Sequence, residues 1–331
     1  MPEHISLAHG NGGRLMRELI EEVFRRHLGP DDLDTDADAV PLPLGGGEPV
    51  ITTDGFTVQP LEFPGGDIGS LAVHGTVNDL AVAGAEPCCL TLNAFIEEGL
   101  ERATLERLIA SAARAARASG VRIIAGDTKV LPRGQGGSLY LATTGVGVRP
   151  PALGLGMDRI RPGDAVLLSG PAGDHGVAVM LAREEFGLSG ELCSDAASVL
   201  PLTRALRPLP GLRFMRDPTR GGVATVVNEI ARATGLGVRL HAPAIPVREP
   251  VRGVCELLGY DPLYLACEGR VVAVVAAEAA AEALGRWQAL AAEAALVGRI
   301  TAPPARVVLE TGLGGERVLD ELEDDPLPRI C

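Results

Sequence analysis

The chain has 331 residues, of which 46% are hydrophobic and 22% are charged, and its formal net charge is −13. This length predicts two domains that each bury a core, and the composition excludes a disordered chain. The negative charge and the aromatic content of only 3% argue against a partner that is nucleic acid or an anionic membrane surface.

Cysteine usage and the N-terminal sequence indicate the compartment. The six cysteines include no Cys-x-x-Cys pair, so neither a disulfide framework nor a zinc site is expected. The first residues lack the basic and apolar regions of a signal peptide, and no uncharged stretch is long enough to span a bilayer. We therefore expect a cytoplasmic protein.

Helix and strand patterns alternate along the N-terminal half. Apolar residues at helical spacing predict a helix over residues 13–28, which Gly29 and Pro30 end. The further elements expected in this half are a strand at 50–53, a helix at 68–84, a strand at 88–96, a helix at 103–119, and strands at 121–125 and 139–148.

A stretch rich in proline and glycine, residues 149–164, separates this half from the second one. The second half is expected to hold strands at 165–168, 238–240, 270–275, 297–300 and 306–309, and helices at 175–186, 198–207, 223–234, 251–258 and 278–293. Because both halves mix helices and strands, the expected fold class is α+β rather than a regular doubly wound sheet.

The last twenty residues have a different composition. Residues 311–315 are predicted to be a hinge, and residues 316–325 carry six acidic side chains against one arginine. Prolines in the final residues favour extended backbone, so a mobile tail is expected. The predicted units are a Gly-rich segment with a helix (1–38), an N-terminal domain (39–150), a C-terminal domain (151–310) and the tail (311–331).

Aspartates recur beside glycines and at the ends of expected strands, at Asp54, Asp67, Asp79, Asp127 and Asp217. Carboxylates at such turns suit a hard divalent cation that bridges to phosphates, and neighbouring glycines let main-chain N–H groups approach phosphate oxygens. Residues 9–13, which include Gly12 and Gly13, offer another phosphate cradle before a helix. The alternative is that these Asp-Gly pairs are turn residues only.

A set of motifs carries a resemblance that covers nearly the whole chain. In chain order they are TTDGF (52–56), GGDIG (65–69), VNDLAVAGAEP (77–87), AGDTKV (125–130), DPTRGG (217–222), CEGR (267–270) and PRIC (328–331). This order resembles the HypE family of hydrogenase maturation factors, within the PurM-like (aminoimidazole ribonucleotide synthetase-like) ATP-binding superfamily. The aspartate motifs are shared across the superfamily, whereas the PRIC motif is specific to HypE. The resemblance implies a two-domain PurM-like fold with a flexible C-terminal tail.

The function that the resemblance implies is that of an ATP-dependent carbamoyl dehydratase. A HypF-type carbamoyltransferase would load a carbamoyl group onto the thiol of Cys331. ATP would phosphorylate the carbamoyl oxygen, and loss of phosphate would leave a thiocyanate. The cyanide would pass to a HypC–HypD type iron scaffold, for a nickel–iron hydrogenase. The superfamily's habit of pairing N-terminal domains also implies a homodimer.

The motif match also implies residue roles. The residues expected to hold Mg²⁺ are Asp54, Asp67, Asp79 and Asp217. The residues expected to bind ATP include Gly12, Gly13, Asp54, Asp67, Asp79, Asp127, Thr128, Arg220, Gly221 and Gly222. The expected catalytic residues are Cys331, Glu268 as general base, and Lys129. Lys129 is the one lysine among 30 basic residues, and lysine, unlike arginine, readily releases a proton when it is desolvated.

Other interpretations stay open at this stage. A selenophosphate synthetase or a thiamine monophosphate kinase would share the ATP motifs, although neither needs Cys331. The chain could also be a non-catalytic carrier that presents Cys331 to another enzyme. His9, His74 and His175 lie near glycines and are expected to make local hydrogen bonds rather than to act as catalysts.

Overall fold

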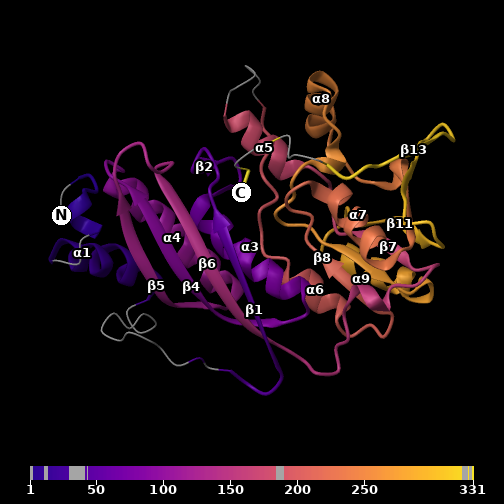
Figure 1. Ribbon diagram of the computed structural model, residues 1–331, viewed down its shortest axis with the longest axis horizontal. Coiled ribbons are helices and arrows are strands. Elements are labelled where there is room, and N and C mark those ends of the chain that lie inside the picture. The colour runs from indigo at the N-terminus through magenta and orange to yellow at the C-terminus, as the bar shows by residue number, and fades with distance from the viewer. Residues whose placement is uncertain are drawn as a thin grey trace.

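Each half of the chain folds around its own sheet, and the two halves lie side by side with the last residue placed between them (Figure 1). The computed structural model describes residues 3–10, 14–29, 42, 44–183, 190–322, 327, 330 and 331. The expected boundary at residue 38 lies outside the described residues, as do Gly12 and Gly13. The α+β fold with two units is confirmed.

The N-terminal sheet has the strand order β1-β6-β4-β5. Its strands are β1 (Glu48–Phe56), β4 (Glu86–Glu97), β5 (Arg122–Leu131) and β6 (Leu139–Arg149). β5 runs parallel to β4, and the other pairs are antiparallel. The helices α3 (Ile68–Val82) and α4 (Arg102–Ser119) pack with this sheet, and β2 (Glu62–Phe63) pairs with β3 (Gly66–Asp67) just before α3.

A helical segment near the N-terminus packs on α4. It runs through α1 (Arg14–Leu19), a π-helical turn η2 (Ile20–Arg25) and α2 (Arg26–Leu28). Leu19, Val23 and Phe24 are buried on one face, as their spacing predicts. The expected helix is therefore confirmed over residues 14–28.

The C-terminal sheet has the strand order β13-β12-β9-β11-β7-β10-β8. Its strands are β7 (Ala165–Leu168), β8 (Leu212–Arg216), β9 (Gly237–His241), β10 (Val272–Val275), β11 (Ala295–Thr301), β12 (Val307–Glu310) and β13 (Glu316–Val318). The helices of this half are α5 (Asp174–Ala182), α6 (Leu200–Leu206), α7 (Gly222–Thr234), α8 (Glu249–Leu258) and α9 (Ala280–Gln288).

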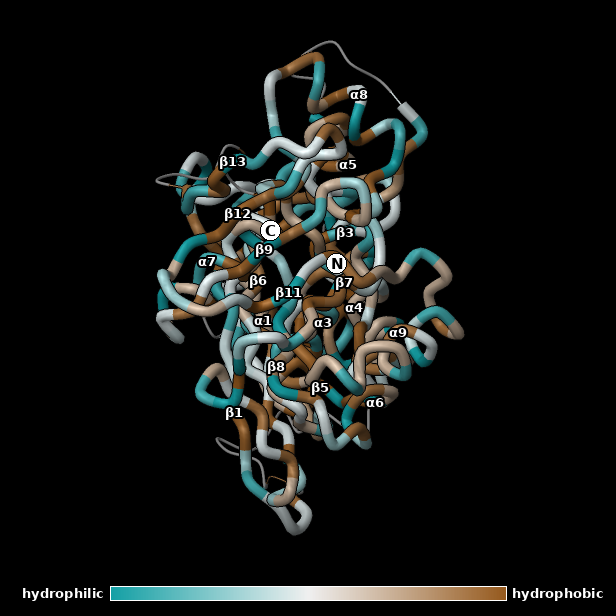
Figure 2. The backbone as a smooth tube through the Cα atoms, turned by 90° about the vertical axis from the view of Figure 1, so that its right-hand side faces the viewer, coloured by the Kyte–Doolittle hydropathy of each residue, from teal (hydrophilic) through white to brown (hydrophobic). Residues whose placement is uncertain are grey.

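The helix α3 connects the two halves. It is buried on nearly every side, because it contacts β1 and β6 on one side and α4, α6 and β8 on the others. Figure 2 shows hydrophobic segments through the middle of the molecule, where α3 and α4 lie. By contrast, α4 buries one stripe and ends at Gly120, which has a φ of 71° and caps the helix in the left-handed region. Asn78 on α3 reaches across the junction of the halves, where its Nδ2 donates to the main-chain oxygens of Ala197 and Glu268.

Several elements differ from the expectation, among them β8, β5 and β13. β8 was not predicted, because its five residues, LRFMR, form a short run that two arginines interrupt. β5 continues through Gly126–Lys129, so these residues lie within a strand and not after one. β13 pairs with β12, so residues 311–315 form a hairpin turn and not a hinge, and Leu319 is fully buried. Within the described residues, no helix is long and apolar enough to cross a bilayer.

Candidate functional site

Two aspartates lie where β1 packs on α3. Thr52 and Asp54 alternate with outward residues of β1, and Gly75 and Asp79 lie one turn apart on α3. The Oγ1 hydroxyl of Thr52 donates to Oδ2 of Asp79 at 2.8 Å. A Cβ at Gly75 would lie 3.9 Å from Oδ2 of Asp54, so this position lies directly beside the carboxylate. The strand and the helix thus bring Asp54 and Asp79 together, as expected.

A third aspartate joins them from the C-terminal half. Asp217 follows β8 and is buried. Burial raises the pKa of Asp217 to about 7, with contributions from the nearby charges of Asp79 and Asp54. Burial also raises the pKa of Asp54 and of Asp79. Each of these three carboxyl groups makes it harder for the others to lose a proton, because their negative charges repel. A bound cation would stabilise all three in the charged form.

The donor set of this acidic cluster (Asp54, Asp79 and Asp217) fits Mg²⁺ only in part. Among the described residues, no three histidine, cysteine, aspartate or glutamate side chains are close enough to hold a metal ion by themselves. In nucleotide sites Mg²⁺ uses one or two carboxylates, and phosphates and water supply its other ligands. The cluster therefore fits a Mg²⁺ ion that arrives with a triphosphate.

Asp67, which we expected in the metal set, has another role. It is the N-cap residue of α3, where Oδ1 accepts from the main-chain N–H of Ser70 at 2.9 Å. Oδ2 accepts from the hydroxyl of Ser111 on α4 at 2.6 Å. Both oxygens are thus used to begin α3 and to fix it against α4. The reason is local, because an aspartate three residues before a serine forms a capping box.

The glycines of the DPTRGG motif form the start of α7. Gly221 and Gly222 have φ values of 68° and 59°, in the left-handed region that favours glycine. A Cβ at Gly222 would lie 2.5 Å from the main-chain oxygen of Leu263, so no side chain fits there. The first main-chain N–H groups of a helix bind anions. This helix start follows directly on Asp217, as the motif predicts.

Glu268 is buried, with an exposed fraction of 2%. Its main-chain N–H donates to Asp195 at 3.1 Å, and its main-chain oxygen accepts from Asn78 of α3 at 3.0 Å. Its Oε1 has no hydrogen-bond partner within the described part of the chain. Burial, Asp217 and Asp195 raise the pKa of Glu268 well above its usual range. A buried carboxyl with a free oxygen is typical of a proton-transfer site.

The end of the chain lies beside Glu268. The main-chain oxygen of Cys331 accepts hydrogen bonds from the N–H of Thr57 at 2.9 Å and from its Oγ1 at 3.1 Å. The Nε–H of Arg220 donates to Sγ of Cys331 at 3.4 Å. Burial and the charge of Glu268 raise the pKa of this thiol to about 12, although Arg220 opposes the rise. In this docked position the thiol is protonated at neutral pH and is a weak nucleophile.

Asp127, Thr128 and Lys129 are not brought to this site within one chain. They lie on β5, at the opposite edge of the sheet from β1, which at ordinary strand spacing is about 14 Å across. Asp127 and Lys129 are exposed and form an ion pair at 2.7 Å. The expected proximity of Lys129 and Glu268 is therefore absent within the described residues of one chain, because the GDTK segment continues the strand.

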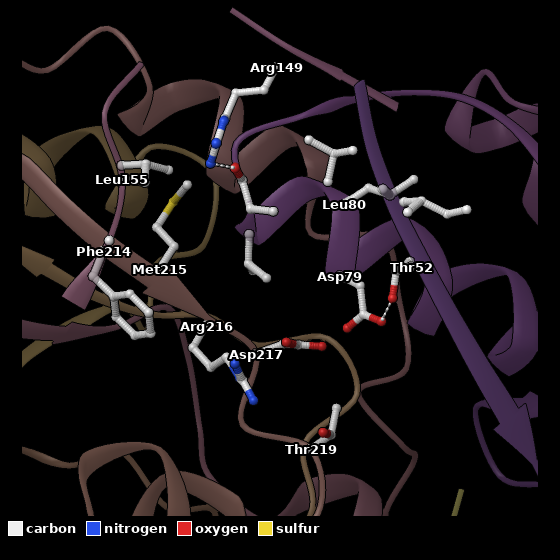
Figure 3. A pocket seen from close by; sticks show the side chains of 15 residues that line it. Thr52, Asp79, Leu80, Arg149, Leu155, Phe214, Met215, Arg216, Asp217 and Thr219 are labelled. Atoms are coloured by element: carbon white, nitrogen blue, oxygen red, sulfur yellow. Dashed lines mark hydrogen bonds between the residues drawn. The ribbon is translucent and has the colours of Figure 1, made fainter. Parts of the chain in front are cut away.

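A pocket of about 480 Å³ lies beside the acidic cluster (Figure 3). Asp79, Asp217 and Thr219 line one end, and Asp79 points toward Asp217 across it. Most of the remaining wall is apolar, and Figure 3 shows Leu80, Leu155, Phe214 and Met215 there. The polar side chains of Thr52, Arg149 and Arg216 also line the pocket. A pocket with acids at one end and apolar side chains along most of the rest suits a nucleotide with its cation.

Two residues at the site were not predicted. His175 was expected to bond locally, but its Nε2 lies 2.8 Å from the main-chain oxygen of Ile330. Thr57 holds Cys331, as described above. No sequence signal marks either residue, since each partner is more than 150 positions away. His9, by contrast, does bond locally, with Nδ1 accepting from the N–H of Ser6 at 3.1 Å.

The fold and this site define the class. Family models described as "AIR synthase related protein" match the chain, the N-terminal domain model over residues 36–149 and the C-terminal one over residues 161–310. Solved thiamine monophosphate kinases share the fold, for example the one from Aquifex aeolicus at 17% identity, with a TM-score of 0.63 over 81% of this chain and 88% of that chain.

Comparison with individual relatives narrows this class to one family. The chain is 48% identical to "Carbamoyl dehydratase HypE" of Azotobacter vinelandii, over 99% of this chain and 97% of that protein, and 43% identical to that of Escherichia coli K12, over 99% of each. It matches a crystal structure of HypE in complex with ATP at a TM-score of 0.93 and 43% identity, over 98% of this chain and 99% of that chain. The chain belongs to the HypE family.

Proposed function

We propose that this chain is an ATP-dependent carbamoyl dehydratase, which converts a carbamoyl group on Cys331 to a thiocyanate for nickel–iron hydrogenase maturation. The observation that carries the proposal is the position of Sγ of Cys331, which contacts Arg220 and lies within the electrostatic influence of Glu268 and Asp54. A carrier that only presents its thiol would not need this buried seat. The name of its relatives supports the same reaction.

The reaction must remove the carbamoyl oxygen and two protons of the carbamoyl nitrogen. Transfer of the γ-phosphoryl group of ATP to that oxygen turns it into a phosphate leaving group. Loss of the protons from nitrogen and departure of phosphate then leave a carbon–nitrogen triple bond. At neutral pH the products are S-cyanocysteine, ADP, hydrogen phosphate and one released proton. The carbamoyl oxygen leaves in the phosphate, and of the two nitrogen protons one ends on the phosphate and one in solvent, so atoms and charge balance without an oxidant or reductant.

Glu268 is the group that we assign to the proton removal. Burial and the surrounding acids raise its pKa, and a carboxylate with a raised pKa binds a proton more strongly than an exposed one. Its Oε1 is free of other hydrogen bonds, so it is available to a substrate N–H. The Arg220 guanidinium lies next to the thiol, which supports a role in contacting the phosphorylated oxygen.

The triphosphate is assigned to the region between Asp79, Asp217 and the start of α7. Asp54, Asp79 and Asp217 would hold Mg²⁺, which when bound would neutralise the phosphate charge. Gly221, at the N-cap of α7, would offer its main-chain N–H to the phosphates, whereas the N–H of Gly222 already donates to the main-chain oxygen of Thr219 at 2.9 Å. The apolar wall of the 480 Å³ pocket would take the base.

A homodimer would give Asp127, Thr128 and Lys129 a place in this site. The sheet face opposite α3 and α4 carries exposed apolar side chains, such as Ile51 on β1 and Phe95 on β4. If a second copy packs on this face with the two-fold axis along the strands, β5 of one copy crosses β1 of the other. Lys129 would then serve the site of the partner subunit.

We also propose two partner proteins. A solved structure described as a HypE–HypF complex matches this chain at 38% identity and a TM-score of 0.81, over 94% of this chain and 100% of that chain. A HypF-type carbamoyltransferase would therefore load Cys331. A HypC–HypD type complex would accept the cyanide. Mass spectrometry of the carbamoylated chain after addition of Mg²⁺ and ATP tests the enzymatic function, because dehydration removes the mass of one water.

A further inference from the structure

In the C-terminal half, His175 binds the end of the chain in addition to Arg220. It lies on α5 and is fully buried, with the ring of Phe63 edge-on at 5.4 Å between centroids. Its Nε2 is 2.8 Å from the main-chain oxygen of Ile330, and its Nδ1 is 2.7 Å from Oγ of Ser194. One imidazole therefore joins the tail to residue 194.

The partners of His175 determine where its proton lies. A main-chain oxygen only accepts, so Nε2 carries the hydrogen and donates it to Ile330. In the neutral ring Nδ1 then accepts from the hydroxyl of Ser194, and that hydroxyl in turn accepts from the N–H of Ala196 at 3.0 Å. The result is a hydrogen-bond chain with one direction, from residue 196 to the tail.

Asp195, the residue after Ser194, binds the main chain of Glu268. It accepts from the main-chain N–H groups of Glu268 at 3.1 Å and Gly269 at 3.3 Å, and Arg270 lies 3.3 Å from its Oδ2. A Cβ at Gly269 would lie 1.9 Å from the main-chain oxygen of Asp195, so the two segments are in direct contact. Ser194 and Asp195 thus link the tail and Glu268 to one short segment.

Besides the bond from Arg220 to Sγ, two residues hold the tail through its main-chain atoms. Thr57 binds the main-chain oxygen of Cys331, and His175 binds that of Ile330, while the side chain of Ile330 is buried. None of these contacts involves Sγ. The same seat therefore serves a free thiol, a carbamoyl group and a thiocyanate.

We propose that His175 and Ser194 are positioning residues, which seat the Ile330 carbonyl and thereby align Sγ of Cys331 with Glu268. The alignment with Glu268 rests on the proposed function, whereas the seating of the tail does not. The imidazole acts through the tail main chain and does not touch the reacting atoms.

The test begins with nucleotide-free protein. Alkylation of Cys331 by iodoacetamide is followed by mass spectrometry of the peptide 324–331 for His175→Ala, His175→Gln and Ser194→Ala. We expect His175→Ala to raise the alkylation rate about fivefold to tenfold, the effect of one buried hydrogen bond. Ser194→Ala should give a smaller rise, and His175→Gln, whose amide donates at a similar position, should restore part of the protection. The control is His241→Gln, an exposed histidine that faces Glu310.

The second readout is a single turnover of the carbamoylated chain at saturating Mg²⁺ and ATP. We expect His175→Ala to slow it about fivefold or more while ATP affinity stays within about twofold. An alkylation rate and a turnover equal to those of the wild type in His175→Ala would overturn the proposal. If His175→Ala does not fold, Ser194→Ala and His175→Gln decide in the same way. If the wild type itself fails to dehydrate, the proposed function is wrong, and alkylation still decides the seating role.

Discussion

Arg220 donates its Nε–H to Sγ of Cys331 at 3.4 Å, so the last residue of the chain contacts the motif that begins α7. The two residues lie 111 positions apart in sequence. This contact places the thiol beside the start of α7, where we propose that the phosphates of ATP bind. The docked thiol also stays protonated at neutral pH, because burial raises its pKa to about 12. Loading by a partner therefore requires the tail to leave this seat.

The first prediction concerns Cys331 itself. Cys331→Ala should abolish carbamoyl acceptance and leave the affinity for an ATP analogue within about threefold, because the contacts of the tail main chain with Thr57 and His175 remain. Isothermal calorimetry with the analogue and Mg²⁺ measures this. A loss of affinity of a hundredfold would mean that the thiol is part of the nucleotide site.

The second prediction compares two aspartates of the α3 region. Asp79→Asn should remove Mg²⁺-dependent ATP turnover, because the amide keeps the shape and lacks the charge that a hard cation needs. Asp67→Asn should leave turnover nearly unchanged, since asparagine also caps a helix and the stability loss stays below about 1 kcal/mol. Steady-state ATP hydrolysis and thermal unfolding measure both. Equal loss of turnover in the two variants would return Asp67 to the metal set.

The third prediction uses mixed dimers to place Lys129. Lys129→Arg and Glu268→Gln should each nearly stop thiocyanate formation in a homodimer. If Lys129 serves the partner's site, a mixed dimer regains one intact site, so mixing the two variants restores part of the activity. Subunits are exchanged, and the cyanated tail peptide is quantified by mass spectrometry. No recovery in verified mixed dimers would show that both residues act within one subunit.

The fourth prediction concerns pH. The pKa of the Cys331 thiol rises from its ordinary value of 9.0 to about 12 when the tail docks. Docking is therefore unaffected below pH 9 and weakens as the pH rises from 9 toward 12, by up to about tenfold for each pH unit. Trypsin cleavage between residues 329 and 330 should become faster at pH 9.5 than at pH 8.

The control for this experiment is Cys331→Ser, whose hydroxyl does not ionise in this range. Its cleavage rate reports the pH dependence of trypsin alone, so the ratio of the two proteins isolates the thiol. A ratio that stays constant between pH 8 and pH 9.5 would mean that the docked thiol is not shielded as the structure indicates.

Much of the fold could be predicted from local patterns. The helix α4 has a clear apolar stripe and ends at Gly120, and α3 follows an Asp-x-x-Ser capping box. The strand β8 could not be predicted, because it is short and partly charged. The extension of β5 through Asp127 could not be predicted either, because Gly and Asp are poor strand formers and only the pairing with β4 keeps them extended.

The sequence could predict which residues form the site but not how they are arranged. Sequence motifs indicated the residues Asp54, Asp79, Asp217 and Glu268, but the packing of α3 between the halves is what brings them together. The same motif evidence grouped Asp67 with them, although its oxygens accept from Ser70 and Ser111, because a capping aspartate and a metal-binding one look alike in a Gly-Asp motif. The seat of the tail depends on contacts between distant positions, which no local pattern indicates.

The central claim is that Glu268 and the seated Cys331 dehydrate a carbamoyl group without another protein. The most direct measurement is mass spectrometry of the peptide 324–331 from carbamoylated protein after addition of Mg²⁺ and ATP, with Glu268→Gln beside the wild type. We predict that the wild-type peptide loses the mass of one water, and that the Glu268→Gln peptide stays carbamoylated because an amide does not accept the proton. A wild-type peptide that stays carbamoylated, or equal loss in both proteins, would contradict the account.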